Sequence, residues 1–146
     1  MTMTYTEIET ALQQLLRPEA VPYDAPTDAD WQSFESRYGC HLGDEFKAFI
    51  ALMSKYQFPG DILNVSSGRT NRNDSISVAY QYELQGAGWD AKMLPFYAIG
   101  NGDYFCLNSL ECPDSRVFYY YAETQVFKPY CDSFEQWIQA LPEFLA

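Results

Sequence analysis

Apolar residues at helical spacing first appear near the start of the chain. Thr6 and Glu9 have the spacing of a capping box, and the apolar residues that follow recur every three or four positions: Ile8, Leu12 and Leu15 or Leu16. This pattern predicts a first helix that begins near Thr6 and ends before Pro18.

Two more helices are predicted between residues 27 and 56. Thr27 or Asp28 offers an N-cap side chain and Gly39 suits a C-cap, with one apolar face made of Trp31, Phe34 and Tyr38. Residues 43–56 place a second apolar stripe on one side of a helix: Phe46, Phe49, Ile50 and Met53.

The pattern changes after residue 60 to short runs rich in Val, Ile, Tyr and Phe, separated by turn residues. These runs predict strands over residues 62–65, 75–82, 96–100, 104–108, 117–122 and 126–131. Asn101 and Gly102 stand between two of the runs, and such a pair supplies the positive φ angles of a tight hairpin turn. The polar segment 66–75, which carries Arg69 and Arg72, is predicted to be a mobile loop.

A terminal helix is predicted after Ser133, which stands at capping-box spacing from Gln136. Helices, then consecutive strands, then a helix indicate an α+β fold, with a mostly antiparallel sheet and the helices packed on it. The length favours one domain over residues 1–146. Nine residues are predicted to be largely buried in its core: Trp31, Phe34, Phe46, Phe49, Ile50, Phe96, Ile99, Phe105 and Trp137.

The charge balance excludes one class of partner. Nine Lys and Arg residues against 20 Asp and Glu residues give a formal net charge of −11. This charge repels a phosphate backbone, whose binding usually needs several basic contacts, so we expect no nucleic-acid partner. A strongly negative surface either steers basic partners or only keeps a small protein in solution, and the sequence leaves both interpretations open.

The sequence carries no sign of a membrane or secretory segment. It has no run approaching the roughly 18 consecutive apolar residues of a membrane span, and its start lacks a basic region followed by an apolar one. We therefore expect a cytoplasmic protein. The cysteines, at positions 40, 106, 112 and 131, are too few and too irregular for a secreted disulfide framework and are expected to be buried thiols.

Residues for catalysis or metal binding are sparse. His41 is the only histidine, and no GxSxG motif supplies a nucleophile for it. No CxxC pair is present, Asp28-Ala-Asp30 is only a fragment of a calcium loop, and the glycines at 86–88 and 100–102 lack phosphate-loop spacing. We predict no catalytic site, no metal and no cofactor.

The acidic residues concentrate in the first third of the chain, where residues 1–45 hold nine acids and two bases. We select six residues as candidate contacts for a basic protein: Asp24, Asp28, Asp30, Asp44, Glu45 and Asp103. Several of them also suit the starts of helices, and Asp103, beside the hairpin turn, can instead accept hydrogen bonds from backbone amides.

A series of motifs recurs in order along most of the chain. It comprises Trp31, Phe34-Glu35 and Tyr38-Gly39, then residues 42–50, 94–96, 100–107, 117–121 and 133–138. The order of these motifs resembles the SUKH superfamily, which includes fungal cell-wall-assembly regulators and bacterial toxin-immunity proteins. The chain departs from the family pattern at Gly43, where a proline is usual, and at residues 57–60, where a paired-glycine turn is common.

The resemblance implies a non-catalytic α+β domain that in bacteria commonly binds and neutralises a toxin domain, often a nuclease. We therefore expect an immunity protein whose acidic side chains cover the active site of a basic toxin. A regulatory adaptor of the cell-wall-assembly type is the alternative, and a small enzyme with an aromatic pocket is a third. The neighbouring reading frame would separate them, because an immunity protein is expected beside a toxin gene.

Overall fold

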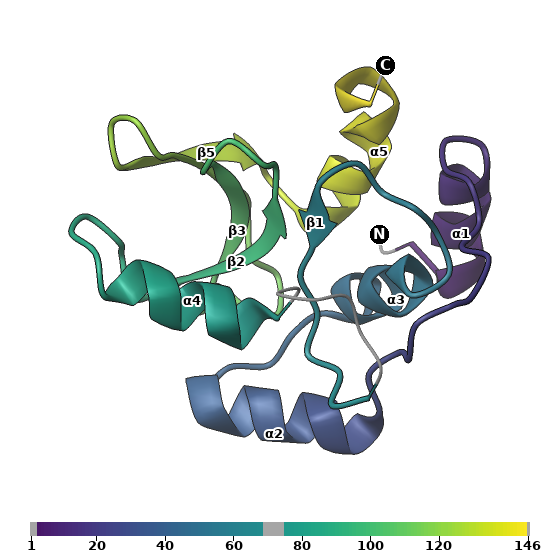
Figure 1. Ribbon diagram of the computed structural model, residues 1–146, viewed down its shortest axis with the longest axis horizontal. Coiled ribbons are helices and arrows are strands. Elements are labelled where there is room, and N and C mark those ends of the chain that lie inside the picture. The colour runs from purple at the N-terminus through teal and green to yellow at the C-terminus, as the bar shows by residue number, and fades with distance from the viewer. Residues whose placement is uncertain (1–2, 69–74, 146) are drawn as a thin grey trace.

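The computed structural model describes residues 3–68 and 75–145 (Figure 1). Its helices are α1 (Tyr5–Gln13), α2 (Asp28–Tyr38), α3 (Asp44–Met53), α4 (Ile76–Leu84) and α5 (Phe134–Phe144). Its strands are β1 (Asp61–Ile62), β2 (Met93–Ala98), β3 (Tyr104–Asn108), β4 (Val117–Tyr121) and β5 (Val126–Cys131). The predicted α+β class is confirmed.

The strands form one antiparallel sheet whose spatial order follows the chain, β1-β2-β3-β4-β5. This confirms the predicted antiparallel arrangement. The register shifts between Pro95 and Tyr97, and again between Val117 and Phe118, and such bulges increase the local bend of a sheet. Figure 1 shows α4 alongside β2 on one side of the sheet. α5 follows β5 in the chain and lies on the other side.

The main core lies where α3 and α5 cover one face of the sheet. Phe49 of α3 and Phe96 of β2 both meet the indole of Trp137, with ring centroids 5.3 and 5.0 Å apart. Eight of the nine predicted core residues are buried, which leaves only Ile99 as a wrong prediction, because this residue begins the hairpin loop and is half-buried.

A smaller apolar cluster covers the opposite face of the sheet. It comprises Met93, Cys106, Phe118 and Tyr120, with Trp89 packed against them. The hydroxyl of Tyr104 donates to a carboxylate oxygen of Glu83 in α4 at 2.9 Å. Because side chains alternate along a strand, β3 and β4 contribute to both clusters.

The strand predicted over residues 75–82 is wrong, because α4 occupies this segment. Ser75 is its N-cap and accepts a hydrogen bond from the Val78 N–H at 3.4 Å. Ile76 and Tyr80, four residues apart, are buried, while Val78 and Tyr82 are exposed. Apolar residues at every second position suggested a strand, but only the pair at helical spacing faces the core.

The hairpin predicted around Asn101 and Gly102 is confirmed between β2 and β3. Its turn differs, because Ala98 pairs with Tyr104 and five residues form the loop. Gly100 and Gly102 adopt φ angles of 111° and 96°, whereas Asn101 does not have a positive φ. The two glycines therefore supply the left-handed backbone that was assigned to Asn101 and Gly102.

Other boundaries follow local capping. α1 begins one residue before Thr6, because Thr4 and Glu7 form its capping box in place of the predicted Thr6 and Glu9. Of the two predicted N-cap residues of α2, Thr27 and Asp28, the cap is Thr27, and Gly39 ends the helix at φ 66° as predicted. Asp30 completes the capping box with Thr27. The strand predicted over residues 62–65 overlaps the observed β1 at Ile62 alone, because β1 ends there. Arg69 and Arg72 lie outside the described residues.

No described helix is long and apolar enough to cross a membrane.

Candidate functional site

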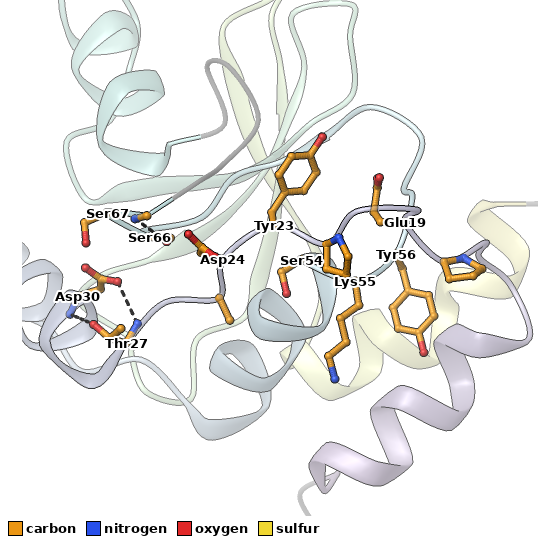
Figure 2. A pocket seen from close by; sticks show the side chains of 14 residues that line it. Glu19, Tyr23, Asp24, Thr27, Asp30, Ser54, Lys55, Tyr56, Ser66 and Ser67 are labelled. Carbon is orange, nitrogen blue, oxygen red and sulfur yellow. Dashed lines mark hydrogen bonds between the residues drawn. The ribbon is translucent and has the colours of Figure 1, made fainter.

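An acidic groove runs between the α1–α2 loop and the end of α3. Its larger cavity has a volume of about 720 Å³ and adjoins a second of about 350 Å³ that shares Glu19, Tyr23, Ser54 and Tyr56 with it. The larger one is shown in Figure 2. The carboxylates of the groove are Glu19, Asp24, Asp30 and Asp61.

Backbone hydrogen bonds hold the α1–α2 loop against α3 and so fix the groove. The N–H groups of Glu19 and Tyr23 donate to the carbonyl oxygens of Lys55 and Ser54 at 2.7 and 2.9 Å. The Gln57 N–H donates to the Arg17 carbonyl at 2.8 Å. Pro18, which has no backbone N–H, fits this loop because no hydrogen bond from its nitrogen is required there.

Asp30 lies in the groove and also caps α2. Its carboxylate accepts a hydrogen bond from the Thr27 N–H at 2.9 Å, and its own N–H donates to the Thr27 hydroxyl at 3.1 Å. The Thr27 N–H, together with the Ser67 hydroxyl, holds the pKa of Asp30 below its usual range. Asp30 therefore carries a negative charge at neutral pH while it stabilises a helix start.

Asp24 lies against the loop that follows β1. A Cβ atom at position 68 would come within 2.5 Å of a carboxylate oxygen of Asp24, so only glycine allows the backbone to approach this closely. The same loop is held by the Ser66 N–H, which donates to Asn64 Oδ1 at 2.6 Å. Asp24 and Asp30 thus share one cavity, as two of the six candidate residues.

Lys55 is the single Lys or Arg among the described residues that line this groove. Its ammonium lies 3.3 Å from the hydroxyl of Tyr5 and 5.8 Å from the centroid of that ring. In Figure 2 its side chain extends away from those of Asp24 and Glu19. The described part of the groove therefore carries an excess of negative charge.

Glu45 contributes to a separate acidic cavity of about 440 Å³ between the β3–β4 loop and the start of α5. All four ionisable residues along its described lining are acids: Glu45, Asp114, Asp132 and Glu135. Asp114, Asp132 and Glu135 were not selected from the sequence, because they are distant from Glu45 in the chain.

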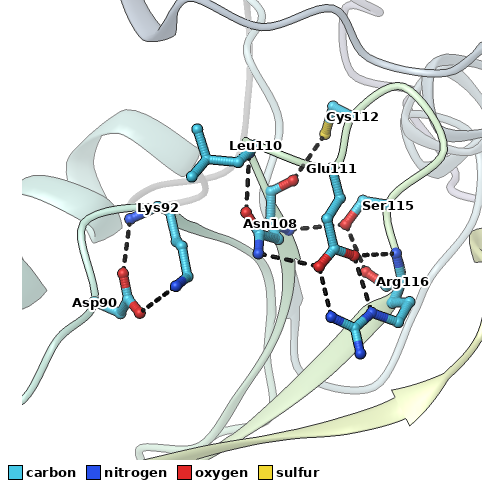
Figure 3. Close-up of polar contacts among 8 residues, drawn as sticks. All are labelled: Asp90, Lys92, Asn108, Leu110, Glu111, Cys112, Ser115 and Arg116. Carbon is cyan, nitrogen blue, oxygen red and sulfur yellow. Dashed lines mark hydrogen bonds and ion pairs between the residues drawn. The ribbon is translucent and has the colours of Figure 1, made fainter.

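The β3–β4 loop lines this cavity with residues 113–115, and polar contacts within the loop brace it (Figure 3). The carboxylate of Glu111 accepts hydrogen bonds from Nε and Nη2 of Arg116 at 3.0 and 2.6 Å, and Arg116 lowers the pKa of Glu111. The Asn108 N–H donates to Ser115 Oγ at 2.8 Å. Leu110 remains 80% exposed at the tip of this braced loop.

Asp28, Asp44 and Glu45 occupy the first turns of helices α2 and α3. The N-cap of α3, Gly43, makes no side-chain hydrogen bond, so the two acids are the side chains that complement the positive end of this helix. Gly43 itself is explained by crowding, since a Cβ there would lie 2.9 Å from the carbonyl oxygen of Pro113.

Asp103 has a structural role in the hairpin. Its carboxylate accepts hydrogen bonds from the Tyr119 hydroxyl at 2.7 Å and from the Ala122 N–H at 2.8 Å. It therefore ties the β2–β3 loop to the end of β4. It belongs to neither acidic cavity.

Glu35, a residue of the family-like motif, connects α2 to α3. It accepts a hydrogen bond from the Leu42 N–H at 2.7 Å and pairs with Lys47 at 3.2 Å. Burial acts to raise the pKa of Glu35, but these two donors hold it below its usual value. His41 lies 3.8 Å from the same carboxylate with 87% of its side chain exposed.

All four cysteines are free thiols; Cys40, Cys106 and Cys131 are buried, and Cys112 is half-buried. Complete burial raises the pKa of Cys106 well above its usual value. Within residues 3–68 and 75–145, no group of three or more His, Cys, Asp or Glu side chains is placed to hold a metal ion.

Comparison with known proteins identifies the family. The chain superposes on a crystal structure of a protein from Pseudomonas syringae pv. tomato with a TM-score of 0.64 and 18% sequence identity, over 92% of this chain and 95% of that one, which shows a shared fold. A search of curated proteins finds no match. The family model described as SMI1-KNR4 cell-wall, SUKH_5, matches residues 6–144. The chain therefore belongs to the SUKH_5, SMI1-KNR4 family.

Proposed function

We propose that this protein is a non-catalytic, cytoplasmic immunity protein that binds and neutralises a basic toxin domain. The observation that carries the proposal is the acidic groove, whose described lining holds four carboxylates and one lysine, and this lysine is turned toward Tyr5. Membership of the SUKH_5 family supports it, because the SUKH superfamily, which the motifs of this chain resemble, includes bacterial toxin-immunity proteins.

The groove suits cationic side chains for two physical reasons. Asp30 is held ionised by the Thr27 N–H, so its charge does not depend on the partner. The groove is also bounded by Tyr23 and Tyr56, whose rings give apolar surface beside the carboxylates. Arginine and lysine combine an apolar stem with a charged head and match such a lining.

Neutralisation follows from competition for the same charges. A toxin that cleaves nucleic acid must attract phosphates with basic residues. An acidic protein that covers those residues excludes the substrate by charge and by volume. Complementary charge also speeds encounter, which suits an inhibitor that must act before damage occurs.

The first test is co-expression of this chain with the product of the neighbouring reading frame in bacterial cells. The proposal expects that product to stop growth when expressed alone and growth to resume when this chain is present. An adjacent product that is harmless would contradict the immunity function.

Charge reversal then tests the groove. The double variant Glu19→Lys/Asp24→Lys is expected to lose protection, whereas Asp90→Lys, an exposed acid paired with Lys92 away from the groove, is expected to protect normally. Circular dichroism checks that both variants fold. Asp30 is left intact because its substitution would remove the cap of α2.

The family description also supports a second function, a regulatory adaptor of cell-wall assembly. An adaptor would bind a protein whose expression is harmless, and loss of this chain would change cell-wall integrity without a toxin. The same co-expression experiment therefore separates the two functions.

A further inference from the structure

A cluster of exposed tyrosines lies at the free edge of the sheet, far along the chain from the acidic groove. We define the tyrosine face as Tyr119 and Tyr121 of β4 with Val126, Lys128 and Tyr130 of β5. Tyr119 pairs with Lys128, and Tyr121 with Val126, so these side chains share one face of the sheet. Tyr121, Val126 and Tyr130 are 42%, 39% and 46% exposed.

The rings of the tyrosine face are held in place by one another, by the buried ring of Phe105 and by Asp103. The Tyr119 ring lies 4.6 Å from that of Tyr121 and 6.4 Å from that of Tyr130, measured between centroids. The buried ring of Phe105 supports both Tyr119 and Tyr130, at 5.0 and 4.8 Å. Because Tyr119 also donates its hydroxyl to Asp103, this surface is preorganised, and little side-chain freedom remains to be lost on binding.

A cation already occupies part of this face. The ammonium of Lys128 lies 5.7 Å from the centroid of the Tyr121 ring, within the range of cation–π attraction. The ring face of an exposed tyrosine is thus shown to accept positive charge here.

Two acids accompany these rings. Asp103 accepts a hydrogen bond from the Tyr119 hydroxyl at 2.7 Å, and Glu123, two residues after Tyr121, is exposed in the turn between β4 and β5. Burial first, and then the charges of Cys131 and Glu143, raise the pKa of Tyr130. Asp103 and Glu123 therefore give this face more negative than positive charge, with Lys128 as its cation.

We propose that the tyrosine face is a second docking surface, which takes an arginine-bearing basic segment of a partner protein. A guanidinium is planar and weakly hydrated, so it stacks on tyrosine rings better than an ammonium does while its charge faces the surrounding carboxylates. The proposal rests on the proposed function in one respect, that the partner is basic.

A second copy of this chain is the less suitable occupant. Each copy carries a net charge of −11, and apposing two of these faces would bring Asp103 and Glu123 of both copies together. Tyrosine and arginine are, in contrast, enriched together at interfaces between different proteins.

The test uses the nitrogen-15-labelled full chain and a synthetic octa-arginine peptide at low salt. We expect the largest amide shift changes in residues 119–130, and a Tyr121→Ala/Tyr130→Ala variant to bind about fivefold more weakly. Tyr82→Ala, which removes a 71% exposed tyrosine from α4, is the matched control and should bind as the unmodified chain does. Octa-lysine is expected to bind more weakly than octa-arginine.

A second variant keeps the test independent of folding. Lys128→Gln removes the resident cation and should strengthen octa-arginine binding about twofold or more. Its control is Arg37→Gln, which removes an equal charge that lies 5.5 Å from the centroid of the Tyr38 ring on α2. Equal gains in the two variants would mean that only net charge matters and would overturn the proposal.

Two further results would overturn it: shift changes confined to other surfaces such as the acidic groove, or self-association of the chain that the tyrosine variants abolish. Because the probe is a peptide, these outcomes are separate from the growth experiment. The immunity function fails if the neighbouring product is harmless, whereas the tyrosine face fails if octa-arginine leaves the amide signals of residues 119–130 unchanged.

Discussion

Replacement of Trp137 by alanine tests whether the aromatic core between α5 and the sheet dominates stability. The indole is 1% exposed and contacts rings from α3, β2, β3 and α5. Its nearest partners are Phe96, Phe49, Phe134 and Phe105, at centroid distances of 5.0, 5.3, 5.4 and 5.5 Å. Truncation of the indole leaves a large cavity, because α3, β2 and β3 hold the surrounding rings in place and the cavity cannot collapse.

The expected loss of unfolding free energy is about 4–5 kcal/mol, the upper part of the range for a buried aromatic truncated in a core. A domain of this size has a total stability of roughly 5–15 kcal/mol, so the variant should be close to unfolding. Trp137→Phe keeps most ring contacts and should cost only about 1–2 kcal/mol. Urea denaturation followed by far-UV circular dichroism measures both variants.

Trp89→Ala is the matched control, since it removes the same side chain from the other face of the sheet. Trp89 is half-buried, and its indole N–H donates to the Met93 carbonyl at 3.2 Å. We expect a loss of about 2 kcal/mol there. The reasoning would be refuted if Trp137→Ala cost less than Trp89→Ala, because the aromatic cluster of the main core would then not carry the fold.

Three further predictions concern titratable groups. Glu35→Ala should lower the free energy of unfolding by about 2 kcal/mol, because the charge-assisted bonds of Glu35 to Leu42 and Lys47 are lost. The pKa of Glu35 is lower in the folded protein than in the unfolded chain. The difference in stability between the variant and the unmodified protein should therefore shrink as pH falls below the usual carboxyl pKa. Burial raises the pKa of Tyr97 to about 12. The contribution of its neutral hydroxyl to the free energy of unfolding should therefore be complete below about pH 10 and be lost as pH rises through 12. Denaturation at a series of pH values measures this loss. Cys106, fully buried with a raised pKa, should react with a thiol reagent only on unfolding, and peptide mass spectrometry after timed labelling would detect earlier reaction.

The fold was predictable wherever local chemistry and burial agree. Thr27 and Gly39 define α2 by caps that need no tertiary contact, and Gly100 and Gly102 permit the hairpin. The strand prediction for residues 75–82 failed because their apolar residues fit both the period of a strand and that of a helix: Ile76, Val78, Tyr80 and Tyr82. Only the packing of Tyr80, whose hydroxyl donates to the Ala91 carbonyl, selects the helix. Such a choice depends on contacts that the local pattern does not contain.

The candidate surfaces were less predictable, because each is assembled from distant segments. Asp24 and Asp30 were selected from the sequence, but Asp61 joins them only through the packing of the loop after α3. Tyr121 and Tyr130 were predicted as strand residues, but the local pattern did not show that both remain exposed. A tyrosine-rich strand beside an edge was the available signal.

The fold itself constrains which carboxylates are free to serve a partner. Asp30 completes the cap of α2 and Asp103 fastens the hairpin to β4, so reversing either charge would alter stability as well as binding. Glu19 has no such bond among the hydrogen bonds of the described side chains, and it borders both cavities of the groove. Reversing the charge of Glu19 should therefore change a partner's affinity without changing the stability of the fold, in contrast to charge reversal at Asp30 or Asp103. If Glu19→Lys left association and its salt dependence unchanged, while the Debye length fell from about 30 Å at about 0.01 M salt to about 8 Å at about 0.15 M, the groove would contribute no steering charge.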